Sequence, residues 1–253
     1  MKKLFKNIIY KLGYDIKKIN KEFINESLEN LLVKKINKNP IIFDVGGNKG
    51  QSIEIFQRIF KNPVVHSFEP IPSEFNFMHQ KFKDNKNMIL NNFALGEAEG
   101  EKTFNISAQT GASSFNKINN NSRWVQVRSK EYNTTIKEFV TSAKIKISTL
   151  DKYYLNNKID HIDLLKIDTQ GYEDKVLQGS LNTLKKNKIK AVITEIIFDN
   201  VYDKYFSFSD IEKFLLPYNF RMVGIYLSSN SLFGNLTFFA DVFYLNKNYY
   251  DFK

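Results

Sequence analysis

Apolar positions recur with two alternating periods along most of this chain, and the two periods predict strands and helices in turn. Residues 41–45 form a short apolar run of strand length that leads into a glycine-rich turn. Apolar residues then follow at helical spacing as far as about Phe60. Strands that alternate with helices are typical of a parallel sheet that is covered on both faces. Further strands of this sheet are expected at residues 64–69, 162–168 and 191–196, and another is expected to start at residues 88–90 and to close at residues 92–96.

The helices expected between these strands carry start and stop signals. Ser73 and Ser209 are predicted to be N-caps, because a serine hydroxyl accepts a hydrogen bond from the first backbone amides of a helix. The helix after the fourth strand is expected to break or kink near Gly179. Two last strands, at residues 221–227 and 240–245, are separated by about a dozen residues, which is too few for a covering helix. We therefore expect these two strands to pair antiparallel.

Residues 97–147 break the alternation and are predicted to form a β-rich insertion with polar loops. A long excursion of this kind in a compact domain is usually functional or disordered. We expect it to lie over the active cleft, on the substrate side. Residues 40–253, which include this insertion, are interpreted as one domain. A basic helical extension at residues 1–39 precedes it. Short alternating runs within the insertion lie at residues 102–106, 124–128 and 144–147.

The N-terminal extension predicts two helices. Residues 1–12 place apolar side chains at helical spacing among lysines, Gly13 is a plausible stop, and residues 22–36 form a second helical stretch. A basic amphipathic helix can lie on an anionic membrane surface. It can equally pack on its own domain or on a partner subunit, and the sequence leaves the oligomeric state open. Peripheral contact with the inner face of the membrane through residues 1–20 is therefore one of two interpretations.

Charge and composition narrow the class of protein. The net charge of +10 is uneven, because residues 1–38 hold ten lysines against four acids, whereas the body of the chain is near balance. A balanced body argues against a nucleic-acid partner. The chain has no cysteine, which removes disulfides and thiolate metal sites and fits a reducing compartment. No secretory signal is recognisable and no apolar run approaches the roughly 20 residues that span a bilayer, so a cytoplasmic protein is expected.

The glycine turn after the first strand is the first sign of chemistry. Its spacing is Gly46-x-Asn48-x-Gly50, one residue shorter than the G-x-G-x-x-G turn that binds a pyrophosphate. Asp44, just before the turn, fits poorly with a phosphate and fits a ligand that carries an ammonium group. Glu69 ends the second strand 19 residues after Gly50, where a carboxylate can accept both hydroxyls of a ribose. The pattern favours a nucleoside ligand over an unrelated α/β fold with ordinary loop and cap residues.

Five short motifs in register resemble the FkbM family of S-adenosylmethionine-dependent methyltransferases over about residues 40–246. They are residues 43–50 (Phe-Asp-Val-Gly-Gly-Asn-Lys-Gly), 68–70 (Phe-Glu-Pro), 92–96 (Asn-Phe-Ala-Leu-Gly), 148–151 (Ser-Thr-Leu-Asp) and 165–173 (Leu-Lys-Ile-Asp-Thr-Gln-Gly-Tyr-Glu). The resemblance implies the class I methyltransferase fold, a Rossmann-like α/β three-layer sandwich. Its seven-stranded, mostly parallel sheet has the order 3-2-1-4-5-7-6, and strand 7 is antiparallel.

The resemblance also implies a site for S-adenosylmethionine over the C-terminal ends of strands 1 and 2. The glycine turn would approach the methionine part, Asp44 would help hold the ammonium group, Glu69 would bind the ribose, and the segment from Asn92 would border the adenine. The cofactor-binding residues implied in this way are Asp44, Gly46, Gly47, Asn48, Gly50, Glu69, Pro70, Asn92 and Ala94.

This chain departs from the family pattern at two positions. Family members usually have Val-Glu-Gly after the acid of strand 4, whereas this chain has Thr169-Gln170-Gly171, so a common carboxylate is absent. They also commonly have alanine where this chain has Gly47. Because Gln170 has no carboxylate, a role of that family acid is not carried over to this chain. The departure at Gly47 is expected to be harmless.

Methyl transfer to a hydroxyl needs alignment of the acceptor and a base or a metal that takes up its proton. The candidates are Asp168, Glu173 and Glu195, at or after the C-terminal ends of strands 4 and 5. Glu173 could instead be an ordinary acid in the first turn of a helix. A divalent metal is conceivable, but no paired His/Asp ligand spacing supports one, and no metal ligand is assigned.

The acceptor is less well defined by the sequence. The segment after Asp168 lacks the Asp/Asn-Pro-Pro-Tyr/Phe pattern of enzymes that methylate exocyclic nitrogen, which favours oxygen. We expect a sugar hydroxyl of a bacterial surface glycan, with Arg123, Trp124 and Arg128 as candidate substrate residues; an ordinary strand with a half-buried tryptophan explains them equally well. Other open alternatives are a different small molecule, a lipid, a nucleic acid, or a non-catalytic membrane-associated protein that retains the fold.

Overall fold

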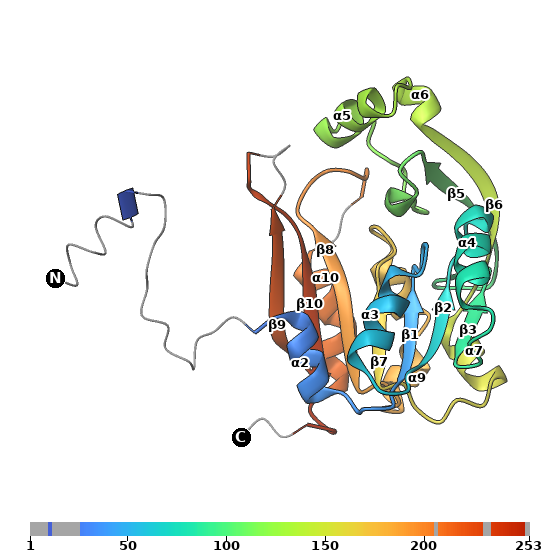
Figure 1. Ribbon diagram of the computed structural model, residues 1–253, viewed down its shortest axis with the longest axis vertical. Coiled ribbons are helices and arrows are strands. Elements are labelled where there is room, and N and C mark those ends of the chain that lie inside the picture. Colours follow the sequence, from blue (N-terminus) through green and yellow to red (C-terminus); the bar gives the residue numbers. More distant parts are fainter. Residues whose placement is uncertain (1–9, 12–25, 205–206, 230–233, 251–253) are drawn as a thin grey trace.

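The computed structural model describes residues 10–11, 26–204, 207–229 and 234–250. Its centre is a seven-stranded sheet in the order β3-β2-β1-β7-β8-β10-β9 (Figure 1). β10 pairs antiparallel with both of its neighbours, whereas the other pairings in the sheet are parallel. The strands are β1 (Ile41–Val45), β2 (Val64–Phe68), β3 (Met88–Asn91), β7 (Leu164–Ile167), β8 (Ala191–Ile197), β9 (Phe220–Ser229) and β10 (Thr237–Asn246).

This topology confirms the predicted fold class. Numbered along the chain within this sheet, the strands follow the order 3-2-1-4-5-7-6 with strand 7 antiparallel, as the class I methyltransferase fold requires. The antiparallel pairing predicted for the last two strands is present as well. The chain changes direction across the sheet between β1 and β7, and in open α/β sheets the ligand cleft lies at such a switch point, beyond the carboxyl ends of the strands.

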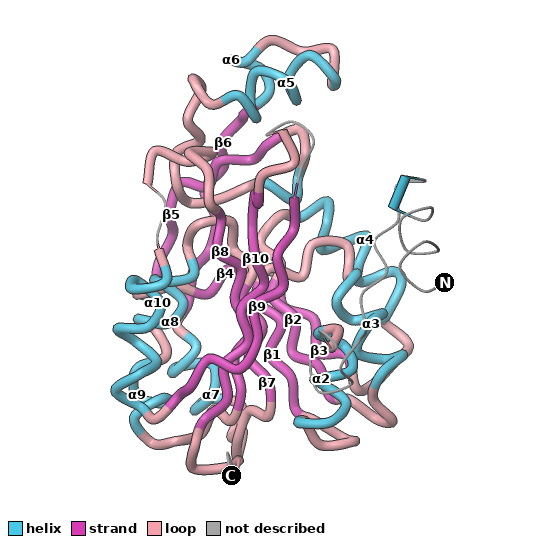
Figure 2. Tube along the Cα trace, turned by 90° about the vertical axis from the view of Figure 1, so that its left-hand side faces the viewer, coloured by secondary structure: helices cyan, strands magenta, loops and turns pink. Residues whose placement is uncertain are grey.

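Two helical layers cover the sheet, because alternate residues of each strand point to opposite faces (Figure 2). In β1, Ile42 belongs to the core beneath one layer and Phe43 to the core beneath the other. The Ile42 side is covered by α2 (Leu28–Lys35), α3 (Gln51–Ile59) and α4 (Pro72–Phe82), and the Phe43 side by α7 (Leu150–Asn156), α8 (Glu173–Gln178), α9 (Leu181–Lys185) and α10 (Phe208–Leu215).

The insertion adds a small second sheet and two helices above the carboxyl ends of the main strands (Figure 1). The third strand was expected to close at residues 92–96, but the chain leaves the main sheet after Asn91, and Ala94 and Leu95 pair with the insertion instead. The second sheet has the order β4-β6-β5. Residues 94–148 contain β4 (Ala94–Leu95), β5 (Gly100–Ser107), the 3-10 turn η2 (Thr110–Ala112), α5 (Arg123–Glu131), α6 (Ile136–Phe139) and β6 (Val140–Ser148).

The prediction of a strand at residues 124–128 is wrong, because this segment is helical. Ser122 caps α5 by accepting a hydrogen bond from the Val125 backbone amide at 3.2 Å. Trp124, Val125 and Ser129 are buried, and their spacing of one, four and five positions places them on one side of a helix. Alternation of apolar and polar residues over so few positions does not distinguish a strand from one side of a short helix.

Two predicted caps are each displaced by two residues. α4 begins at Pro72 rather than after Ser73, since proline suits the first helical position. α10 follows Ser207, whose hydroxyl and the Asp210 carboxylate form a capping box. The break predicted near Gly179 is confirmed: it separates α8 from α9, and a Cβ at Gly179 would lie 2.0 Å from the Gly96 carbonyl oxygen.

Of the two predicted N-terminal helices, residues 28–35 form α2, whereas most of residues 1–25 lie outside the described residues. Within the described part of the chain, no helix combines the length and the apolar character that crossing a membrane would require.

Candidate active site

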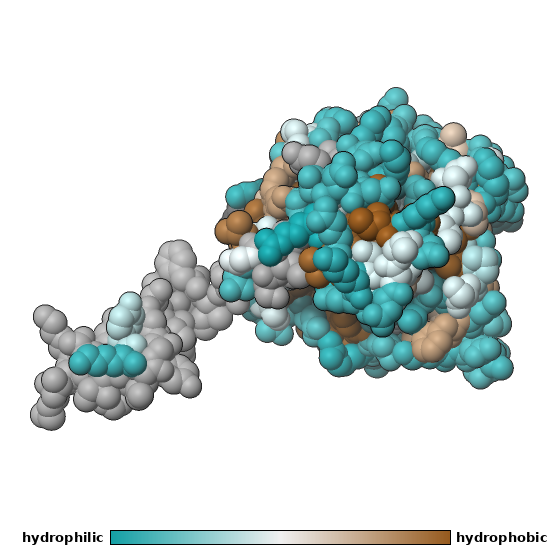
Figure 3. Space-filling view, turned by 90° about the horizontal axis from the view of Figure 1, so that it is seen from above, coloured by the Kyte–Doolittle hydropathy of each residue, from teal (hydrophilic) through white to brown (hydrophobic). Residues whose placement is uncertain are grey.

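A cavity of about 310 Å³ opens at the carboxyl ends of β1, β2 and β7. Figure 3 shows the molecule from this end, with apolar side chains in the middle of a mostly hydrophilic surface. The cavity joins the glycine turn, the end of β2, the end of β7 and the insertion. Seven of the residues predicted for the site line it: Gly46, Gly47, Asn48, Glu69, Pro70, Ala94 and Asp168.

The glycine turn is fixed against β2 and β7. The backbone amides of Gly46 and Gly47 both donate to the Phe68 carbonyl oxygen at 3.0 Å. Gly46 has φ +91°, and a Cβ there would lie 1.9 Å from the Asp168 carbonyl oxygen, so both conformation and space require glycine. A Cβ at Gly47 would lie 2.2 Å from the Ser67 hydroxyl. Glycine in place of the family's usual alanine therefore matches the serine that this chain has in β2.

Glu69 lines the cavity from the end of β2 with only 4% of its surface exposed. Its carboxylate accepts hydrogen bonds from the Asn48 amide at 2.8 Å and the Ile71 amide at 2.7 Å. Burial raises the pKa of Glu69 to about 7, although the two backbone hydrogen bonds oppose that rise. Each carboxylate oxygen retains acceptor capacity beyond its one backbone hydrogen bond, so the group can also accept hydroxyl protons of a ligand.

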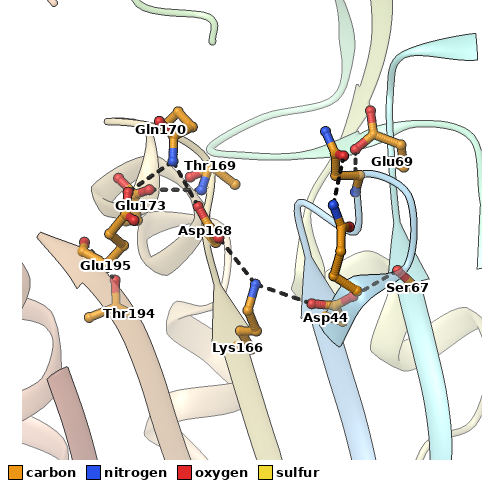
Figure 4. A network of polar contacts seen from close by, with 12 residues as sticks. Asp44, Ser67, Glu69, Lys166, Asp168, Thr169, Gln170, Glu173, Thr194 and Glu195 are labelled. Atoms are coloured by element: carbon orange, nitrogen blue, oxygen red, sulfur yellow. Dashed lines mark hydrogen bonds and ion pairs between the residues drawn. The ribbon is translucent and has the colours of Figure 1, made fainter. Parts of the chain in front are cut away.

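Lys166 of β7 is a functional residue that the sequence analysis missed. Its ammonium lies 3.4 Å from a carboxylate oxygen of Asp44 and 3.4 Å from one of Asp168, between the two acids (Figure 4). Burial alone would lower the pKa of Lys166, but the negative charges of Asp168 and Asp44 raise it above its ordinary value. Lysine therefore carries a fixed positive charge at the switch point. Its alternation within an apolar strand was the signal available, since Lys166 faces opposite to Leu165 and Ile167.

Asp44 is fully buried and does not line the cavity, whereas Lys166 does. The Oδ2 atom of Asp44 accepts a hydrogen bond from the Ser67 hydroxyl at 3.0 Å. The Oδ1 atom of Asp44 has no hydrogen-bond partner among the described residues. Two other residues predicted for the cofactor also lie outside the lining. Gly50, with φ +86°, precedes the first residue of α3, and the exposed Asn92 donates from its amide to the Glu69 carbonyl oxygen at 2.9 Å.

Gln170 connects the candidate acids of β7 and β8. Its side-chain nitrogen donates to Asp168 at 2.9 Å and to Glu195 at 2.8 Å (Figure 4). The Tyr202 hydroxyl donates to the side-chain amide oxygen of Gln170 at 3.1 Å. Burial, followed by the negative charges of Asp168 and Glu173, raises the pKa of Glu195 well above its ordinary value. In the sequence, Gln170 stands out only as the position where an acid is absent, whereas the structure brings Asp168 and Glu195 together through it.

Glu173 lies beneath the turn rather than in the cavity lining. It is 1% exposed, and its Oε1 accepts from the Thr169 amide at 2.7 Å and the Gly171 amide at 3.3 Å. Its Oε2 has no hydrogen-bond partner within the described segments. Burial raises the pKa of Glu173 to about 8. These contacts support the turn that carries Gln170.

A second cavity of about 160 Å³ adjoins the first, and Gly111 and Gln170 line both. Of the three predicted substrate residues, Trp124 lines it with 4% of its surface exposed. Arg123 is exposed on α5, and Arg128 forms an ion pair with Glu131 on the same helix. The second cavity is lined by Gln109, Gly111, Ala112, Trp124, Gln170, Glu195, Ile197, Val201, Phe238 and Phe239.

Aromatic residues of the insertion form one wall of the first cavity, and the sequence analysis did not single them out. Phe115 packs on Phe104 and on Tyr172, with 4.8 Å between ring centroids in both pairs. Lys102 of β5 donates to the Tyr172 hydroxyl at 2.5 Å, and that hydroxyl donates to Glu97. This wall consequently ties the insertion to the turn after β7.

The site offers acids but no arranged metal centre. Across the residues that the structure describes, no three His, Cys, Asp or Glu side chains are grouped so that they could hold an ion. Asp168 and Glu195 are instead joined by the Gln170 amide.

The lining fits S-adenosylmethionine. Glu69 presents a buried carboxylate with spare acceptor capacity beside an open backbone turn, which suits a ribose diol. The apolar Phe68, Ile71, Leu95 and Phe104 provide walls for a purine ring. Lys166 and Asp168 face the cavity together, so the ligand meets both signs of charge, as a zwitterionic amino-acid group requires.

The profile of the family described as Methyltransferase FkbM domain matches residues 44–222. The chain is 24% identical over 165 residues to the 2-O-methyltransferase NoeI of Sinorhizobium fredii, and the match spans 65% of this chain and 66% of that protein. Among solved structures, an rRNA methylase from Streptococcus thermophilus is similar with a TM-score of 0.47 and 10% identity, over 91% of this chain and 98% of that one. The magnesium protoporphyrin IX methyltransferase of Synechocystis PCC 6803 is similar with a TM-score of 0.46 and 12% identity, over 97% and 96%.

Proposed function

Since this chain belongs to the FkbM family of S-adenosylmethionine-dependent methyltransferases, we propose that it transfers a methyl group from S-adenosylmethionine to a hydroxyl oxygen of a sugar. The observation that carries this proposal is the pair of adjoining cavities. Glu69 faces the first, Glu195 faces the second, and Gln170 lies on the lining that the two share. Cofactor and acceptor can therefore meet at the junction of the two cavities.

When bound, S-adenosylmethionine supplies a methyl group on positive sulfur, and its carbon–sulfur bond breaks toward sulfur as the acceptor oxygen bonds to the methyl carbon. The residues of this chain align the acceptor and take its proton. Alignment of two bound reactants lowers the barrier by several kcal/mol. Glu195 receives the hydroxyl proton on its carboxylate, and Asp168, held by Lys166 and Gln170, keeps the negative charge near the junction.

Several features support oxygen of a sugar as the acceptor. The related NoeI is by name a 2-O-methyltransferase. The turn after β7 lacks the proline-containing pattern of enzymes that methylate exocyclic nitrogen, and the near-balanced charge of the body argues against a nucleic-acid acceptor. We place the sugar in a surface glycan assembled on the cytoplasmic side of the membrane. Contact with the inner face through residues 1–20 belongs to the same proposal and lies almost entirely outside the described residues.

Replacing the base should remove activity without removing the fold. Glu195→Gln keeps the size of the side chain and is expected to lower kcat on the order of 100-fold, because general bases typically contribute at least that much. The change in kcat is measured as the rate at which labelled methyl groups pass from S-adenosylmethionine to glycan extracted from producing cells. Wild-type activity should also rise with pH, since burial and neighbouring acids raise the pKa of Glu195 and only its carboxylate form accepts a proton.

The control is Glu99→Gln, which changes a half-exposed surface acid that pairs with Lys152. It should retain wild-type activity and the same pH profile. In cells, deletion of the gene should remove one methyl group from a surface sugar, as read by mass spectrometry. Unchanged glycans, or full activity of Glu195→Gln, would contradict the proposal.

A further inference from the structure

We infer that the second cavity is a subsite for the acceptor's sugar ring, with Trp124 as part of its aromatic wall and Gln170 as the residue that positions Glu195 at its inner end. This inference rests on the proposed function, because it names where and how the proposed acceptor binds. It is carried by the composition of the cavity, by its junction with the cofactor cavity and by the hydrogen bonds of Gln170.

The walls of the second cavity differ in character from one part to another. Trp124, from the insertion, and Phe238 and Phe239, from β10, supply aromatic surface. Polar groups come from Gln109, Gln170 and Glu195. A pyranose ring has the complementary character, because its C–H bonds form an apolar face and its hydroxyls project from its edge. Aromatic rings offer a flat apolar surface of matching size.

Charge narrows the ligand further. Among the described residues that line the second cavity, Glu195 is the sole acidic or basic side chain. Arg123 and Arg128 do not line it. A phosphate or carboxylate would meet no cation among these lining residues and would lie beside the carboxyl group of Glu195. The cavity therefore suits an uncharged, hydroxyl-bearing ring, and any charged carrier attached to that ring must extend outside it.

The junction places this ring beside the cofactor. Gly111 and Gln170 line both cavities, so the two cavities adjoin at these residues. A Cβ built on Gly111 meets no atom within 4 Å, so Gly111 has open space on that side. A hydroxyl on the ring edge can thus approach the first cavity while it remains within reach of Glu195.

Gln170 holds one orientation because its partners demand it. The two N–H groups of its amide point at two carboxylates, Asp168 and Glu195, at 2.9 and 2.8 Å. The reversed amide would aim its carbonyl oxygen at both acids, and an ionised carboxylate has no proton to donate to it. Its backbone has φ +56°, a conformation that a residue other than glycine rarely adopts. Such strain is retained where the surrounding contacts outweigh its cost, often at functional sites.

The consequence for Glu195 is a fixed position at the cavity wall. One of its oxygens is held by the Gln170 amide, so the other is the natural acceptor for a ligand hydroxyl. Glutamate at position 170 would place a third carboxylate between Asp168 and Glu195. This chain's departure from the family pattern is therefore what allows two acids to share one donor.

The single tryptophan of the chain makes this subsite directly observable. Trp124 is the only one, so its emission reports binding in the second cavity. The protein, saturated with S-adenosylhomocysteine, is titrated with methyl glycosides of glucose, mannose, fucose and rhamnose. At least one glycoside should change the emission saturably and should be methylated when S-adenosylmethionine replaces the product. Trp124→Leu should weaken binding of that glycoside at least about 10-fold by saturation-transfer NMR, whereas Phe77→Leu, on the exposed side of α4, should not.

Two variants test the positioning role of Gln170. Gln170→Gly suits the backbone conformation and removes the amide, so it should fold, bind the glycoside within about 3-fold of wild type and lose at least about 10-fold in kcat. Gln170→Glu should move the acid limb of the pH–rate profile to higher pH, because a third negative charge opposes ionisation of Glu195. A purely structural role would instead change melting temperature and leave the pH profile in place.

The outcomes separate this inference from the proposed function. A glycoside that is methylated without any change in Trp124 emission, with unaltered turnover by Trp124→Leu, overturns the subsite while the methyltransferase assignment stands. An unshifted pH profile in Gln170→Glu overturns the positioning role. If the protein binds S-adenosylmethionine but methylates neither these glycosides nor the extracted glycan, the proposed function fails and the sugar subsite fails with it.

Discussion

Replacement of Lys166 by methionine is expected to lower the free energy of unfolding by about 3 to 5 kcal/mol, the usual cost of removing one partner of a buried ion pair. Methionine has a similar length, so packing changes little. Asp44, with none of its surface exposed, would keep only the Ser67 hydroxyl as a donor among the described residues. Urea denaturation of the two proteins at neutral pH measures the difference.

Two further variants show whether charge is the cause. Lys152→Met removes a half-exposed ion pair with Glu99 and should cost no more than about 1 kcal/mol. The double variant Asp44→Asn/Lys166→Met should recover part of the loss, because it no longer buries an unpaired charge. Equal stability of Lys166→Met and Lys152→Met would contradict the assigned ion pair.

Replacement of Glu173 by glutamine is expected to remove a large pH dependence of stability. Burial raises the pKa of Glu173 from 4.5 to about 8, so the folded chain holds this proton more tightly than the unfolded chain. The resulting stabilisation is complete below about pH 4.5 and is lost as the pH rises through about 8. Because one pKa unit corresponds to about 1.4 kcal/mol, the whole change is on the order of 5 kcal/mol.

Glutamine at position 173 mimics the protonated acid. Its carbonyl oxygen can accept from the Thr169 and Gly171 amides, as Oε1 does now, and its NH2 group takes the place of the unpartnered Oε2. Denaturant unfolding should therefore show similar stability of both proteins near pH 5 and a more stable Glu173→Gln near pH 9. An identical fall in the stability of both proteins between these pH values would show that Glu173 does not carry this dependence.

The main sheet could be predicted because its signals are local. The parallel strands β1, β2 and β7 are short, mostly apolar runs that are followed by a turn or an acid, and a parallel sheet buried on both faces requires such runs. The glycine turn and Glu69 could also be predicted from the sequence. Both follow the carboxyl end of a strand, and ligand-binding residues of a parallel sheet lie at these ends. The structure brings the two together through the hydrogen bond from the Asn48 amide to Glu69.

The insertion and the charge network could not be predicted in the same way. The helix at Trp124 depends on the Ser122 cap and on burial beneath distant residues such as Val201 and Phe239, contacts that no local period records. Lys166 and Gln170 draw their roles from partners far away in the sequence. A lysine in a strand and a glutamine in a turn are unremarkable until the fold places Asp44 and Glu195 beside them.

Equilibrium binding of S-adenosylmethionine tests the central claim most directly, because every later step assumes the cofactor beside Glu69. By isothermal titration, wild type should bind at micromolar cofactor, and Glu69→Ala should bind at least about 30-fold more weakly, as expected for lost hydrogen bonds to a charged acceptor. Glu99→Ala should bind like wild type, and melting curves should show all three proteins folded. Failure of the wild type to bind at micromolar cofactor, or wild-type affinity in folded Glu69→Ala, would contradict the account.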